Sequence, residues 1–179
     1  MRFELVASVC VLAPAPAFAV DYLTADQAAK LMFPDADRFE ARQVTLDAQQ
    51  MQQLDARGIR KRSAKWFVRV AERGGKPLGY VVVDEVIGKF ELITYAVAIG
   101  LDGTVMQVEV LSYRESHGYE IRMPGWRRQF VGKTSASPMR IGEDISNIGG
   151  ATLSCNHVTD GVKRVVAVVD LEIKAGALP

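Results

Sequence analysis

The chain has few of the residues from which metal centres, disulfides and charged binding surfaces are built. Among 179 residues it has two histidines and two cysteines, and its net charge is +1. So few imidazoles and thiols argue against a zinc or haem site. The balanced charge gives no electrostatic reason to expect a nucleic acid or an anionic membrane surface as partner. The length suits one domain with a sizeable core better than two domains.

Long apolar runs are also scarce, and the clearest one stands at the N-terminus. Arg2 precedes an apolar run from Leu5 to Ala13, and Ala17-Phe18-Ala19 has the small-residue pattern of an export cleavage site. We therefore predict that residues 1–19 are a cleaved signal peptide, that residues 20–179 form a single domain, and that the protein is periplasmic or otherwise extracytoplasmic. An uncleaved N-terminal anchor is the alternative.

Cleavage would remove one of the two cysteines. Cys10 lies within the apolar run, and Cys155 would remain as the one thiol of the mature chain. The mature protein would then have no internal disulfide and would depend on its core for stability. Next to a predicted helix start, Cys155 is expected to be a small buried hydrophobe.

Two short helices are predicted near the N-terminus of the mature chain. Thr24 with Gln27 and Asp47 with Gln50 both have the spacing of a capping box. Apolar residues at helical spacing follow each pair, and Pro34 ends the first helix.

The middle of the chain predicts an antiparallel sheet. From Lys65 the apolar residues alternate with a period of two, and β-branched or aromatic runs follow. Gly74-Gly75 and Asp102-Gly103 are typical of hairpin turns between such strands. After Lys65 the predicted strands cover residues 78–87, 92–99 and 105–113.

The C-terminal third changes character again. A polar connection from Arg114 to Glu120 precedes a short helix that Pro124 starts and Gly132 stops. A long final helix is predicted from apolar residues at three- and four-residue spacing, with Asn156 as a reasonable cap and a strand over residues 165–173 as the alternative. The residues of this apolar face are Val158, Val162, Val165, Val166, Val169 and Ile173.

The segment that leads into this helix is a glycine-rich turn, Asn147-Ile148-Gly149-Gly150-Ala151-Thr152-Leu153-Ser154. Adjacent glycines permit positive φ and a close approach of backbone to another molecule, and backbone N–H groups converge at a helix start. This is the geometry of a phosphate cradle. On geometry alone, a tight turn that merely feeds a helix remains the alternative.

The turn resembles the Ser-Gly-Ala-Thr motif of the FMN-binding domain family, which includes the covalent-FMN subunits of the Rnf and sodium-pumping NADH:quinone reductase complexes. The likeness extends to the helix end at Met32 to Asp37 and to Trp126, Gln129, Phe130, Gly132 and Lys133. It implies that Thr152 is joined to FMN through a phosphoester. It further implies that the loop is shaped by Asn147, Gly149, Gly150, Ala151, Leu153 and Ser154, and that the ring or ribityl side is formed by His117, Gly118 and Tyr119.

This resemblance sets the remaining expectations. The fold should be α+β, a twisted antiparallel sheet with helices packed on one face and a C-terminal helix following the flavin-phosphate loop. The function should be electron transport by an extracytoplasmic flavoprotein, a carrier more than an enzyme with its own substrate. Its FMN would be installed by an FAD:protein FMN transferase, and its partners would be redox proteins such as a membrane electron-transfer complex.

Two departures from the family pattern keep other functions open. The family has serine or threonine where this chain has Gly149, and an acidic residue where it has Ser146. An exported binding or sensor module that holds FMN loosely, or not at all, is the first alternative. A flavin-dependent reductase ranks last, because no further catalytic acid or base is identified. Trp126 could stack on the flavin ring, but a core position is favoured.

Overall fold

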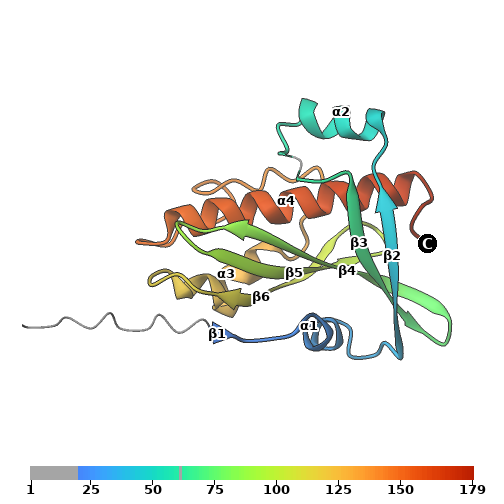
Figure 1. The fold of residues 1–179 in the computed structure, drawn as a ribbon, viewed down its shortest axis with the longest axis horizontal. Helices are drawn as coiled ribbons and strands as arrows, with labels where there is room; N and C mark the ends of the chain where they lie inside the picture. The colour runs from blue at the N-terminus through green and yellow to red at the C-terminus, as the bar shows by residue number, and fades with distance from the viewer. Residues whose placement is uncertain (1–19, 61) are drawn as a thin grey trace, which may run out of the picture.

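A computed structural model describes residues 20–60 and 62–179. The predicted signal peptide, including Cys10, lies outside the described residues. The described chain forms a six-stranded antiparallel sheet in the order β1-β6-β5-β4-β3-β2 (Figure 1). The strands are β1 (Val20–Asp21), β2 (Arg38–Thr45), β3 (Lys65–Arg73), β4 (Lys76–Ile87), β5 (Leu92–Gly100) and β6 (Val105–Tyr113).

The predicted hairpins are confirmed. Gly74 and Gly75 have φ of 56° and 75° in the turn between β3 and β4. Gly103, with φ of 79°, allows the turn between β5 and β6, because glycine adopts these angles without a Cβ penalty. The last predicted strand, residues 105–113, has the bounds of β6.

A long helix, α4 (Thr152–Lys174), lies along one face of the sheet and contacts β4 and β5 (Figure 1). Its predicted apolar face is buried from Val158 to Val169, so the strand alternative for this region is wrong. The helix begins at Thr152, and Asn156 is therefore not its cap. The Asn156 Nδ2 instead donates to the Thr152 carbonyl oxygen at 2.9 Å.

The opposite face of the sheet carries the first helix, α1 (Ala25–Met32). The Thr24–Gln27 capping box is present as predicted. Ala28, Ala29, Met32 and Phe33 pack in a second core against residues of β3, β4, β5 and β6 that include Ala71, Val81, Ala96, Ala98 and Leu111. The antiparallel sheet with a C-terminal helix is thus confirmed, and α1 adds a helix to the second face. The sheet residues on this face include several alanines, whose small side chains leave space for α1.

The other helices are short. The Asp47–Gln50 capping box starts α2 (Ala48–Ala56), whose Leu54 belongs to the same core as α4. After β6 come η1 (Tyr119–Arg122), α3 (Pro124–Arg127) and η2 (Arg128–Phe130). Gly132 then leaves the helical conformation with φ of 81°, as predicted. No helix within residues 20–60 or 62–179 has the length and apolar character needed to cross a membrane.

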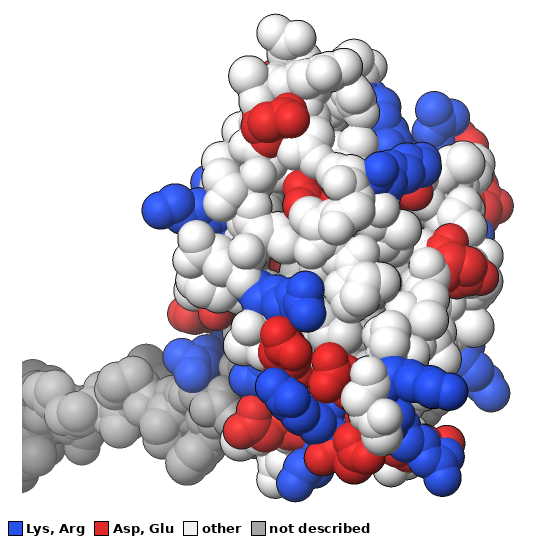
Figure 2. Space-filling view, turned by 90° about the vertical axis from the view of Figure 1, so that its right-hand side faces the viewer, with Lys and Arg blue, Asp and Glu red and all other residues white. Residues whose placement is uncertain are grey.

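Sequence patterns did not predict β1 or β2. The strand β2 pairs with β3 along its whole length, from Arg38 opposite Glu72 to Thr45 opposite Lys65. It is an edge strand with the polar sequence RFEARQVT, and Val44 is its buried residue. Figure 2 views the molecule from this side, and positive and negative side chains are interspersed there without a large area of one sign.

Candidate functional site

The predicted phosphate turn leads directly into α4. Gly150 has φ of 81°, and within the described chain a Cβ at Gly149 or Gly150 would meet nothing within 4 Å. Ala151 is the N-cap residue, and no side-chain cap bond is found there among the described residues. The first-turn N–H groups of a helix have no intrahelical partner, so an uncapped start leaves them available to an anion. The space beside the two glycines is also open.

Thr152 is the first residue of α4 and its side chain is exposed. Its Oγ1 accepts a hydrogen bond from the Asn147 Nδ2 at 3.1 Å. The neighbouring Leu153 is 46% exposed, whereas Ser154 is buried. The hydroxyl that the motif singles out is therefore accessible from solvent and held in place by a residue of the same turn.

The loop that carries His117, residues 114–118 between β6 and η1, also lies at the start of α4. We call it the His117 loop. Gly118 is buried with φ of 88°, and a Cβ on it would lie 2.5 Å from the Ala151 Cβ and 2.7 Å from the Tyr113 hydroxyl. His117 is exposed, with its Nδ1 2.9 Å from the Ser116 Oγ. Tyr119 is also exposed. The structure thus brings together the two groups of residues that the sequence predicts for the site.

The start of the turn is held by the helical segment around α3. The Trp126 Nε1 donates to the Ser146 carbonyl oxygen at 2.8 Å, and the Ser146 N–H donates to the Gln129 Oε1 at 2.8 Å. Trp126 is 5% exposed and meets Phe130 edge-on at 5.2 Å between ring centroids. Its ring is part of the core, as predicted, and it anchors the turn through its indole nitrogen.

Asp144, the acidic residue that most closely precedes the glycine-rich turn, already accepts several hydrogen bonds. It accepts from the Lys133 Nζ at 2.7 Å, the Arg140 N–H at 2.7 Å and the Met139 N–H at 3.2 Å. Burial raises the pKa of its carboxyl, but these donors outweigh burial and lower the pKa below its usual value. The Asp144 carboxylate is therefore bound within the loop, to donors of residues 133–140.

A third segment, the turn between β4 and β5, borders the site and was not predicted to do so. The His157 Nδ1 lies 2.5 Å from the Ile87 carbonyl oxygen and 3.1 Å from that of Gly88. Glu115 accepts from the Phe90 N–H at 2.6 Å, which ties this turn to the His117 loop. Phe90 is 75% exposed. A large apolar residue in a hairpin turn is the one sequence feature that could have indicated this role.

One buried carboxylate oxygen near the site, the Oε2 of Glu120, accepts no hydrogen bond from the described residues. Burial raises the pKa of both the Tyr113 hydroxyl and the Cys155 thiol, local hydrogen bonds oppose this rise, and the charge of Glu120 adds to it in both cases. Cys155 is fully buried, as predicted.

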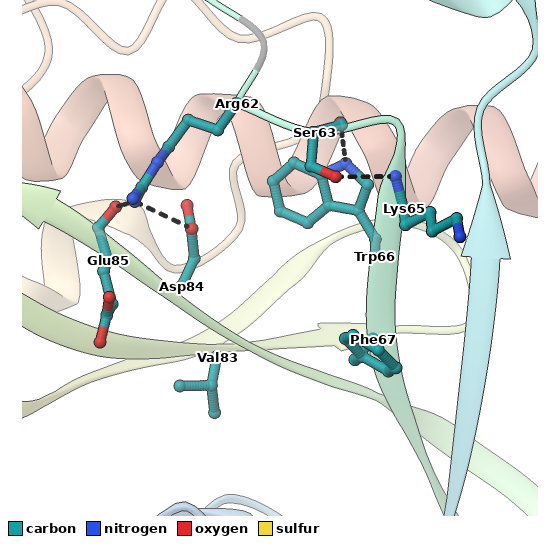
Figure 3. Close-up of a pocket in the computed structure, with 8 residues that line it drawn as sticks. All are labelled: Arg62, Ser63, Lys65, Trp66, Phe67, Val83, Asp84 and Glu85. Carbon is teal, nitrogen blue, oxygen red and sulfur yellow. Dashed lines mark hydrogen bonds and ion pairs between the residues drawn. The ribbon is translucent and has the colours of Figure 1, made fainter.

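A cavity of about 400 Å³ lies elsewhere, where β3 and β4 separate (Figure 3). Their pairing extends no further than Val68 opposite Val82. Arg62 crosses the gap, donates to the Glu85 carbonyl oxygen and lies 3.7 Å from the Asp84 carboxylate. The lining residues are Arg62, Ser63, Lys65, Trp66, Phe67, Val83, Asp84 and Glu85.

The predicted site contributes no residue to this cavity or to a shallower one of about 700 Å³ near the C-terminal end of α4. No group of three or more metal-binding side chains occurs in the part of the chain that the structure describes. Thr152, Leu153, His117 and Tyr119 are exposed, so the predicted site lies at the protein surface around a helix start.

An exposed hydroxyl at an uncapped helix N-terminus, flanked by open glycines, has the geometry on which phosphorylated ligands bind in other proteins. Comparison with known proteins identifies the family. Residues 88–167 match the FMN-binding domain. The chain is 30% identical over 135 residues to the G subunit of the proton-translocating ferredoxin:NAD(+) oxidoreductase complex of Clostridium ljungdahlii, covering 71% of this chain and 72% of that protein. The chain belongs to the FMN-binding domain family, as its motif predicts.

Two solved structures are also similar. Shewanella oneidensis NqrC matches 77% of this chain and 80% of its own length, with 18% identity and a TM-score of 0.48. The C subunit of the Na(+)-translocating NADH-quinone reductase of Parabacteroides distasonis matches 79% of this chain and 84% of its own length, with 18% identity and a TM-score of 0.46.

Proposed function

We propose that this protein is an extracytoplasmic flavoprotein that carries electrons through FMN attached by a phosphoester to Thr152. The observation that carries the proposal is the position of the Thr152 hydroxyl, exposed at the uncapped start of a helix of 23 residues in a chain of the FMN-binding domain family. Bound FMN would supply the capacity to accept and release electrons, and the protein would bind and orient it.

The residues of the turn fit a phosphoester. The first-turn N–H groups would donate to the phosphate oxygens, and a negative charge at this end of a helix is stabilised by about 0.3–1 kcal/mol. Asn147 holds the acceptor oxygen, and the glycines leave room for the phosphate. On attachment by an FAD:protein FMN transferase, the Thr152 oxygen would bond to the FMN phosphorus, AMP would leave, and the hydroxyl proton would pass to solvent.

The surroundings of the site support a carrier. Leu153, which follows Thr152, is partly exposed, and His117, Tyr119 and Phe90 are exposed as well. Neither cavity described above opens at these residues. A flavin held here would remain close to the protein surface, where partner proteins such as a membrane electron-transfer complex can approach it.

Flavin fluorescence on a denaturing gel tests the proposal after co-expression with the transferase and export. The wild-type band should fluoresce, and Thr152→Val should abolish the signal, because valine preserves the shape of threonine without its hydroxyl. Thr45→Val is the matched control, since Thr45 is an exposed threonine at the end of β2. A dark wild-type band, or a fluorescent Thr152→Val band, would refute attachment at this residue.

Export is tested on the same protein. We propose cleavage after Ala19, so N-terminal sequencing of protein from the extracytoplasmic fraction should start at Val20. Recovery of the full-length chain in the membrane fraction would favour the uncleaved anchor.

A second candidate is an exported module with this fold that binds FMN reversibly or has lost it. The glycine at position 149 and the serine at position 146 favour it, and Asp144, the acidic residue nearest upstream, is bound to Lys133 and Arg140. Saturable quenching of added FMN together with an unmodified mass would support this candidate. A mass increase equal to one FMN phosphoester would exclude it.

A further inference from the structure

The two halves of the proposed site lie far apart in the sequence and meet at one side chain, Tyr113. This residue ends β6, and its ring belongs to the main core with 3% of the residue exposed. Its hydroxyl donates to the His117 carbonyl oxygen and lies 3.3 Å from the Ser154 Oγ. A phenol has one proton to donate and can also accept. The bonds therefore run from Ser154 to Tyr113 and from Tyr113 to the His117 loop.

Packing restricts this junction further. Gly118 lies so close to Ala151 and to the Tyr113 hydroxyl that a Cβ would overlap both. The His117 loop thus rests on the residue that precedes Thr152, and its position depends on the same hydroxyl that bonds to Ser154. Loss of that oxygen would release the loop from the first turn of α4.

We propose that Tyr113 is a positioning residue of the flavin site. By joining the His117 loop to the start of α4, it fixes the polar groups beside the flavin relative to the point of attachment at Thr152, and thereby sets the flavin's reduction potential. This inference rests on the proposed function. Tyr113 itself lies beneath the surface and acts through His117 and Ser154.

The fold supplies a matched control in Tyr95. This tyrosine is fully buried on the adjacent strand β5, and its hydroxyl donates to the Asp84 Oδ2 at 2.7 Å. It also touches α4, because a Cβ on Gly161 would overlap its hydroxyl. Tyr113→Phe and Tyr95→Phe therefore each remove one buried hydroxyl under the same helix. Only the first of these hydroxyls contacts the site.

The decisive measurement compares holoprotein of the two variants by midpoint potential and visible circular dichroism of the flavin. Both variants should unfold at lower temperature than wild type. Tyr113→Phe alone should shift the potential and change the flavin's dichroism, and Ser154→Ala should do so in the same direction to a smaller extent. If Tyr113→Phe keeps the wild-type potential and dichroism while its melting temperature falls as in Tyr95→Phe, the role is only structural and the proposal is overturned.

A second readout does not depend on flavin. In flavin-free protein, Tyr113→Phe should accelerate amide hydrogen exchange in residues 116–120 by roughly fivefold to tenfold, the change expected for the loss of one hydrogen bond. Tyr95→Phe should leave this segment unchanged. If exchange in flavin-free Tyr113→Phe is unchanged, Tyr113 does not hold the His117 loop against α4. The proposal is then overturned, even where the wild-type protein carries flavin. A wild-type protein without flavin would instead refute the proposed function and the effect on potential.

Discussion

Stability should depend strongly on one buried ion pair between the sheet and α4. The Arg164 Nη2 lies 2.5 Å from the Asp84 Oδ2, and the side chains are 7% and 12% exposed. The same carboxylate accepts from Tyr95 and lies near Arg62. In contrast, the Arg164 Nε has no hydrogen-bond partner among the described residues. The guanidinium thus depends on Asp84 more than Asp84 depends on it.

This asymmetry predicts how three variants rank in their free energy of unfolding. Asp84→Ala leaves a buried, unpaired guanidinium and should lower the free energy of unfolding by about 3–5 kcal/mol. Arg164→Met leaves Asp84 with Tyr95 and Arg62 and should cost less, about 1–2 kcal/mol. The double variant Asp84→Leu/Arg164→Met replaces the pair by apolar side chains and should be more stable than Asp84→Ala alone.

Urea unfolding at pH 7, followed by far-UV circular dichroism, measures these differences. Asp160→Ala is the control, since Asp160 is an exposed residue of α4 and should change stability by no more than about 0.5 kcal/mol. An Asp84→Ala cost below that of Arg164→Met would refute the reasoning. The folded fraction of each variant should still take up FMN, because Arg164 lies twelve helical steps, about 18 Å, from Thr152.

Two further predictions concern the ends of α4. Burial raises the pKa of Glu172 despite the hydrogen bond from Gln50, so the folded state holds this proton more tightly than the unfolded state. Stability should therefore fall as pH rises from the unfolded value near 4.5 through the folded pKa. Glu172→Gln should remove that loss and be more stable than wild type at pH 7 in parallel urea titrations; equal slopes with pH would contradict this. At the other end, Asn147→Ala should slow flavin incorporation into Thr152 by roughly threefold to fivefold, as expected for one neutral hydrogen bond. A wild-type rate on a fluorescence time course would show that the bond is unimportant.

Local interactions explain how much of the fold could be predicted. Each capping box joins residues three apart, so Thr24 with Gln27 and Asp47 with Gln50 are readable from spacing alone. The edge strand β2 could not be predicted in this way. Its sequence is polar with little apolar alternation, and it is a strand because it pairs with β3, which is a tertiary contact. The glycine turn was correctly predicted to lead into α4, but Asn156 was wrongly predicted as a cap, because the apolar face begins only at Val158.

The residues of the candidate site likewise include some that the sequence could predict and some that it could not. The motif residues around Thr152 and the loop at His117 were identified in the sequence, and the structure brings them together. Tyr113 was not identified, because it appears in the sequence as one more aromatic residue of a strand. Its role depends on contacts with residues 4 and 41 positions away. The contribution of Phe90 was missed for a related reason, since its turn joins the site through Glu115.

The burial of α4 explains how an exposed site can begin a helix that is firmly packed on the sheet. Gly161 brings the helix so close to the sheet that any Cβ would overlap the Tyr95 hydroxyl. A glycine within a helix costs about 1 kcal/mol relative to alanine, so this close approach is maintained against local helix propensity. Together with the pair between Arg164 and Asp84, it fixes where the helix lies on the sheet. Thr152 then extends from a buried element, and an attached flavin would be exposed to its partners while its anchor stays fixed.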